Sequence, residues 1–95
     1  MESRDEEAMQ REEFTLKSIN GLSSRASASL VNEANKYESN IRLEYSSEEV
    51  DLKSIMNVMA LVIRNQETFS LVVDGKDEHA ALIGLKNVLK DMKLV

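Results

Sequence analysis

Apolar and polar side chains alternate in four short segments of the chain, the spacing typical of half-buried strands. These segments are residues 14–19, 40–45, 50–53 and 69–73. The first and last end at Asn20-Gly21 and Asp74-Gly75, which are turn signals, and only a short Ser-Ser-Glu stretch separates the middle two. The pattern therefore predicts four strands, two of them joined as a hairpin.

Three other segments place apolar or small side chains three and four residues apart, as on one face of a helix. The first follows Ser23 and Ser24, the second follows Ser54 and the third opens at Asp77, and each of these residues can cap a helix. The predicted inner faces are Ser27, Leu30, Val31, Ala34 and Tyr37 in the first, Ile55, Val58, Met59 and Val62 in the second, and Leu82, Leu85, Val88, Leu89 and Met92 in the third.

The predicted order of elements is β-α-β-β-α-β-α, which indicates an α+β fold. Each helix must bury its apolar stripe, and the simplest arrangement places all three on one face of a four-stranded sheet. The other face of the sheet is then open to solvent. Such a layout offers no deep pocket, so we expect functional sites at helix ends and surface patches.

Length and composition support a single small domain. The chain has 95 residues, of which 42% are hydrophobic, and this suffices for one modest core without metal or disulfide support. Residues 1–13 hold six acidic and two basic side chains, so the remainder is nearly neutral although the formal net charge is −5. We therefore predict an acidic, disordered tail over residues 1–12 and a folded domain over residues 13–95.

Several classes of function are disfavoured by the composition. With no basic excess and only two Phe and two Tyr, the chain lacks the means for direct binding of nucleic acid. No apolar run is long enough for a signal peptide or a membrane span, and the absence of Cys gives no sign of an oxidising compartment, so we expect a cytoplasmic protein. The one histidine, His79, is predicted to be a solvated residue at a helix start, and we expect no metal site and no cofactor.

Residues 52–61, Leu-Lys-Ser-Ile-Met-Asn-Val-Met-Ala-Leu, closely resemble the regulatory-serine motif of the HPr family, the small phosphocarriers of the bacterial sugar phosphotransferase system. Residues 13–93 also follow the element order of that family. The resemblance implies an HPr-like open-faced β-sandwich, with a four-stranded antiparallel sheet and three helices on one face.

The phosphocarrier motif of the family is Gly-[Ile/Leu]-His-[Ala/Ser]-Arg-Pro-Ala, and the similar stretch here is Gly-Leu-Ser-Ser-Arg-Ala-Ser over residues 21–27. The carrier histidine position is thus Ser23. A serine has no imidazole nitrogen to act as a nucleophile at neutral pH, and a phosphoserine ester cannot pass its phosphoryl group downhill as a phosphohistidine can. We therefore expect no phosphocarrier activity and no enzymatic activity. Arg25 survives from the motif, either as a partner contact or as a solvated arginine.

Ser54 matches the residue that the HPr kinase/phosphorylase phosphorylates in this family. The resemblance implies that the phosphorylated form would act as corepressor of the catabolite control protein, a LacI-type regulator. Ile55, Met56 and Met59 would supply an apolar patch for partners. The simpler reading leaves Ser54 as a helix cap, with Ile55 and Met59 in the core and only Met56 exposed.

The combination of a missing histidine and a retained serine is similar to the Crh-like variants of the family. The alternative is a degenerate phosphotransferase-like interaction module with no phosphorylation at Ser54. A true phosphocarrier is a third hypothesis, which Ser23 disfavours. An exposed sheet edge further predicts a weak homodimer.

Overall fold

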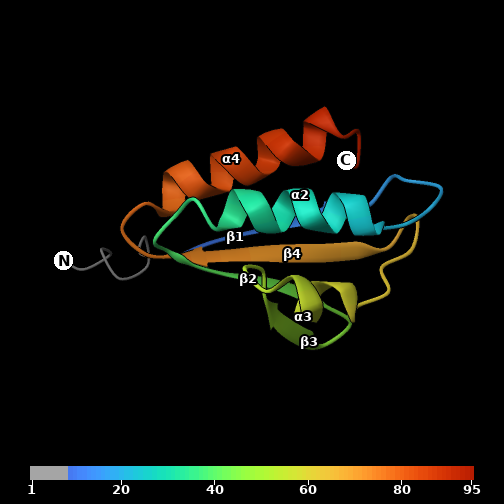
Figure 1. Cartoon of the computed structure of the whole chain (residues 1–95), viewed down its shortest axis with the longest axis horizontal. Coiled ribbons are helices and arrows are strands. Elements are labelled where there is room, and N and C mark those ends of the chain that lie inside the picture. Colours follow the sequence, from blue (N-terminus) through green and yellow to red (C-terminus); the bar gives the residue numbers. More distant parts are fainter. Residues whose placement is uncertain (1–8) are drawn as a thin grey trace.

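The computed structural model describes residues 9–95. The order of elements is β-α-β-β-α-β-α, as the sequence pattern predicts (Figure 1). The strands are β1 (Met9–Thr15), β2 (Asn40–Tyr45), β3 (Glu48–Asp51) and β4 (Thr68–Asp74), and the helices are α2 (Ser24–Ala34), α3 (Ile55–Met59) and α4 (Glu78–Asp91).

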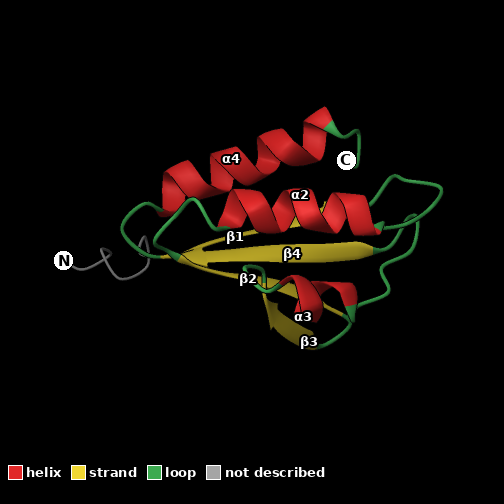
Figure 2. Ribbon diagram, in the orientation of Figure 1, coloured by secondary structure: helices red, strands yellow, loops and turns green. Residues whose placement is uncertain are grey.

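The four strands form one antiparallel sheet in the order β1-β4-β2-β3. The long central strand β4 lies between β1 and β2 (Figure 2). Its alternate residues Phe69, Leu71 and Val73 are buried in the core, while Thr68, Ser70 and Val72 face the other side of the sheet. The predicted α+β class and the open-faced arrangement with a four-stranded antiparallel sheet are confirmed. No helix within residues 9–95 is long and apolar enough to cross a membrane.

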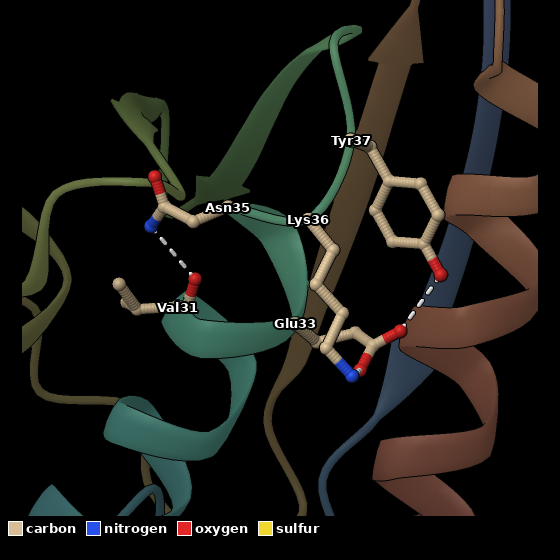
Figure 3. A network of polar contacts seen from close by, with 5 residues as sticks. All are labelled: Val31, Glu33, Asn35, Lys36 and Tyr37. Atoms are coloured by element: carbon tan, nitrogen blue, oxygen red, sulfur yellow. Dashed lines mark hydrogen bonds and ion pairs between the residues drawn. The ribbon is translucent and has the colours of Figure 1, made fainter.

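Helices α2 and α4 pack closely together above the sheet (Figure 1). Gly84 of α4 lies against two side chains from the α2 side, since a Cβ at this position would displace the hydroxyl of Tyr37 and the carboxylate of Glu33. Those two groups are hydrogen-bonded, with the Tyr37 hydroxyl donating to Glu33 Oε2 at 2.7 Å (Figure 3). The bond lowers the pKa of Glu33 and raises the pKa of Tyr37. The α2–α4 interface thus contains this Tyr37–Glu33 hydrogen bond beside the apolar core.

The first strand differs from the sequence prediction. It begins at Met9 and pairs with β4 from Met9↔Asp74 to Thr15↔Thr68, so residues 9–12 belong to the sheet and not to a tail. Residues 16–19 continue as a loop, in which Leu16 is buried and Ile19 is 91% exposed. Apolar spacing identifies a strand only where its side chains are buried, whereas backbone pairing also accepts the polar residues of β1. The rest of the predicted tail, residues 1–8, lies outside the described residues.

The second helix is shorter than its apolar spacing predicts. Helix α3 ends at Met59, which is 49% exposed, and Val62 beyond it is 65% exposed. The chain turns out of the helix so that Leu61 and Ile63 are buried instead. The prediction that Val62 packs inward is therefore wrong, because the apolar spacing was extended past the end of the helix. Of the two alternatives for Met59, core or partner patch, its exposure favours the patch.

A carboxylate joins the start of β2 to the start of α4. Asp77 accepts hydrogen bonds from the Ser39 hydroxyl at 2.5 Å, from the Ser39 N–H at 3.0 Å and from the Glu38 N–H at 2.9 Å. The Ser39 hydroxyl is the main cause of a lowered pKa for Asp77, followed by the Glu38 N–H. The ionised carboxylate of Asp77 thus connects two loops that are 38 residues apart in the chain, and the strength of this connection depends on pH.

The hydrogen bonds of Asp77 are expected to make the stability of the fold depend on pH. Because the pKa of Asp77 is lower in the folded state, its contribution to stability is complete above the unfolded-state pKa, about 4, and is lost as the pH falls through the folded-state value. Asp77→Asn should therefore lower the Tm at pH 7, and the gap to the natural chain should narrow on acidification. Thermal unfolding followed by circular dichroism from pH 7 to acid measures the gap. Asp91→Asn, an exposed residue at the end of α4, is the control; a Tm gap for Asp77→Asn that stays constant with pH would contradict the role of its charge.

Candidate functional site

Ser23 caps the first helix. Its backbone is extended, with φ −72° and ψ 167°, and its Oγ accepts a hydrogen bond from the N–H of Ala26 at 3.1 Å. Its carbonyl accepts the first helical bond, from the N–H of Ser27 at 2.9 Å. The residue is exposed. The prediction of a serine cap at this helix start is confirmed, and the hydroxyl is accessible to solvent while it caps.

The loop before Ser23 is attached to the segment after α3. Gly21 has φ +71°, and a Cβ there would lie 2.6 Å from the carbonyl oxygen of Ile63. The N–H of Leu22 donates to that same oxygen at 2.9 Å. Glycine is thus required both for the left-handed backbone and for the close approach. The contact holds the start of α2 against the end of the α3 region.

Arg25 extends from the first turn of α2 into solvent. It forms no ion pair and no side-chain hydrogen bond with any residue in the described range. Its guanidinium is therefore free to contact a partner. His79, in the first turn of α4, is also exposed, as predicted.

Ser54 caps the short helix α3. Its backbone is extended, with φ −107° and ψ 109°, and its Oγ accepts from the N–H of Asn57 at a long 3.4 Å. A hydrogen bond of this length is weak, so the hydroxyl is only loosely held by the helix. The residue is half-buried. Both readings of Ser54, as a cap and as a modifiable hydroxyl, are compatible with this geometry.

Contacts from the end of α2 position the residue before Ser54. The side-chain amide of Asn35 donates to the carbonyls of Val31 at 2.9 Å, seen in Figure 3, and of Lys53 at 3.2 Å. The Lys53 ammonium donates to the carbonyl of Tyr37 at 2.6 Å. These bonds join the C-terminal end of α2 to the approach to α3. The Lys53 charge is consequently directed at a backbone carbonyl and not at Ser54.

The three apolar residues predicted as a partner patch lie differently. Met56 is 80% exposed and Met59 is 49% exposed, whereas Ile55 is half-buried and packs against the core cluster. Helix α3 buries Val58 fully, and this orientation turns the two methionines outward. The exposed surface of α3 therefore consists of its methionines, with Ile55 at the margin.

Sequence reasoning missed two residues of this surface. Ile19, placed at a strand end, and Val62, placed on an inner helix face, are both exposed. Together with Met59 they line an open hollow of about 460 Å³ between the loop that leads to Ser23 and the loop that follows α3. The only available signal was the Asn20-Gly21 turn next to Ile19, which marks a loop but not its exposure. We call Ile19, Met56, Met59 and Val62 the apolar surface.

The comparisons with known proteins agree with this arrangement. The family model described as the PTS HPr component phosphorylation site matches residues 10–91, which is most of the chain. This chain belongs to the HPr family. The resemblance drawn from the two serine-bearing segments is thereby confirmed at the level of the family.

Three solved HPr-family structures illustrate the similarity. The histidine-containing phosphocarrier protein of Mycoplasma is 31% identical over 90% of this chain and 98% of that chain, with a TM-score of 0.88. The phosphocarrier protein HPr of Bacillus anthracis is 32% identical over 85% and 96%, with a TM-score of 0.78. Crh, a catabolite repression protein of Bacillus subtilis described as an intertwined dimer with a swapped domain, is 32% identical over 82% and 90%, with a TM-score of 0.68.

Proposed function

We propose that this chain is a Crh-like regulatory member of the HPr family that does not carry phosphate on a histidine. Ser54 is phosphorylated by HPr kinase/phosphorylase, and the phosphorylated protein acts in the cytoplasm as corepressor of a LacI-type catabolite control regulator. The observation that carries the proposal is the pair of helix caps. Serine stands at position 23, where the family motif has its histidine, while Ser54 keeps its motif beside the exposed Met56.

The surroundings of Ser54 suit reversible modification. Its hydroxyl makes one long hydrogen bond, and its side chain supports no part of the buried core. A phosphate would add nearly two negative charges next to the apolar surface without displacing a core residue. Phosphorylation is therefore expected to change what the surface binds and to leave the fold unchanged.

The partner surface follows from the same geometry. Met56 and Met59 present flexible, polarisable side chains, which adapt to different binding partners. Ile55 contributes at the margin, and Arg25 offers a guanidinium for a carboxylate of the regulator.

The swapped dimer of Crh supports a homodimer of this chain as well. Light scattering that finds only monomer at high concentration would contradict the homodimer.

Intact mass measured after incubation with ATP and HPr kinase/phosphorylase tests the proposal. We expect one phosphate on the natural chain and none on Ser54→Ala, because only Ser54 has the kinase motif. Ser23→Ala is the matched control, since it removes the other serine cap and should still accept one phosphate. Phosphate on Ser54→Ala, or none on any of the three chains, would contradict the assignment of Ser54.

The second candidate is an interaction module without phosphorylation at Ser54. The observation in its favour is that Ile19 and Val62 extend the apolar surface independently of any modification. If none of the three chains accepts phosphate, this function becomes the leading one. Met56→Ser and Val62→Ser would then be the variants with which to map the partner.

A further inference from the structure

A row of carboxylates crosses the open face of the sheet. Glu13 of β1 and Glu44 of β2 are the direct cross-strand neighbours of Ser70 on β4, and Glu49 of β3 is the direct neighbour of Glu44. The order across the four strands is therefore Glu13, Ser70, Glu44, Glu49, which we call the acidic row. Like charges in adjacent positions repel each other, so this row needs cations beside it.

One side of the acidic row is already neutralised by arginines. Two residues along the strands, Arg11 and Arg42 flank Val72 in register, again on the open face. Arg11 donates to Glu44 at 2.6 Å, and Arg42 donates to Glu49 at 2.9 Å. Guanidinium groups of the protein itself thus pair with the acidic row, from one side only.

On the other side of the acidic row, residues 9–95 place no Lys or Arg next in register. The next residues along the same face are Thr15 and Thr68, which are paired, and the β2–β3 turn consists of Ser46 and Ser47. Glu13 forms no ion pair with any residue in the described range. Its negative charge therefore remains without a counterion within hydrogen-bonding distance on that side.

An open hollow of about 470 Å³ lies over this uncompensated side. Its lining includes the whole acidic row together with Glu48, Thr68 and the turn serines, and Arg11 borders it. Four glutamates line this space, and two arginines, Arg11 in the lining and Arg42 beside Glu49, pair with two of them, so that a net negative charge remains. A further cation would therefore be attracted into it.

Ser70 supplies an independent indication of a ligand. It is only 6% exposed, and because Phe69 and Leu71 on either side of it face the core, its side chain faces the open side and lines the hollow. Within residues 9–95 its hydroxyl makes no hydrogen bond. A buried polar group without a partner is costly, which makes this hydroxyl a ready hydrogen-bonding group for a ligand in the hollow.

We propose that this hollow binds an arginine side chain from a basic segment of a partner protein. The guanidinium would sit over Ser70, between its neighbours Glu13 and Glu44, so that the acidic row is paired with guanidinium groups on both sides. Arginine suits the site better than lysine because its planar fork can engage several carboxylate oxygens at once. The hollow is separate from Ser54 and the apolar surface, so this partner can bind whether or not Ser54 is phosphorylated.

Titration of the isotope-labelled natural chain with a peptide of six arginines tests the proposal by nuclear magnetic resonance. The amides of Glu13, Ser70 and Glu49 should shift together as peptide is added, at low salt. Glu13→Gln should weaken binding about fivefold, as expected for loss of one charge-assisted hydrogen bond, and Ser70→Ala about threefold. A peptide of six lysines should bind several-fold more weakly.

Glu38→Gln is the matched control, because it removes another exposed negative charge, beyond the opposite end of β2. It should leave the affinity unchanged. Equal weakening by Glu38→Gln and Glu13→Gln would reduce the effect to general attraction between opposite charges and overturn the proposal. Shifts confined to the helices, or spermidine binding at Ser70 as tightly as the peptide, would overturn it as well.

Discussion

Replacing Ser23 with His is expected to yield a chain that accepts phosphate from phosphoenolpyruvate and Enzyme I, whereas the natural chain accepts none. An imidazole is largely neutral and nucleophilic near pH 7, while a serine hydroxyl needs an adjacent base that the start of α2 does not provide. Position 23 is exposed and precedes the first turn of the helix, two residues before Arg25, which forms no ion pair within residues 9–95. The expected change is from no measurable phosphorylation to one phosphate per chain.

Intact mass before and after mild acid measures this change, because a phosphohistidine is labile to acid and a phosphoserine is not. Ser24→His, one residue further on, is the control and should remain unmodified. Loss of the Ser23 cap costs about 1 kcal/mol of stability, so circular dichroism should confirm that the variant folds. A folded Ser23→His chain that stays unphosphorylated would indicate that Ala26, where the family has proline, or another change has also removed recognition by Enzyme I.

Replacing Leu71 with Ala is expected to have the largest effect on stability. Leu71 is fully buried in the middle of β4, the central strand, with β1 and β2 on its two sides. Truncation of such a leucine typically costs about 3 kcal/mol, and up to ~5 kcal/mol, because apolar burial is lost and a cavity is left. Since small domains are stable by only about 5–10 kcal/mol, the variant should be close to unfolding at 37 °C.

Urea unfolding at equilibrium measures the difference in free energy of unfolding. Ile83→Ala is the matched control, because Ile83 is a large apolar residue on α4 that is 60% exposed. It should change stability by no more than about 0.5 kcal/mol. A similar loss in both variants would mean that the core is not centred on β4 as described.

The two serine caps could be found from the sequence because helix capping is a local interaction. Ser23 and Ser54 each accept a bond from an N–H three residues later, so the donor, the acceptor and the helix start all lie within four residues. The strand β4 was equally visible, since the apolar residues that face the helices, Phe69, Leu71 and Val73, recur at every second position. Where a pattern depends on neighbours in the chain, the sequence is sufficient.

The residues at which strands and helices begin and end depend on packing instead. Residues 9–12 carry no apolar pattern and became a strand because β4 is long enough to pair with them. Val62 continued the spacing of α3 and yet lies in solvent, since burial of Leu61 and Ile63 required the helix to end at Met59. A run of apolar residues indicates that part of the segment is buried. It does not specify which of these side chains point into the core.

By itself the sequence determined the order of the elements, the two serine caps and the family, because all three depend on residues close together in the chain. Only the tertiary structure determined which residues make up the apolar surface and the acidic row. Ile19 and Met59 line one hollow, and the acidic row from Glu13 to Glu49 crosses all four strands, although Glu49 lies 36 positions after Glu13 in the chain. The physical reason is strand pairing. Register places distant residues side by side on one face, and nothing in a one-dimensional pattern records which strands become neighbours.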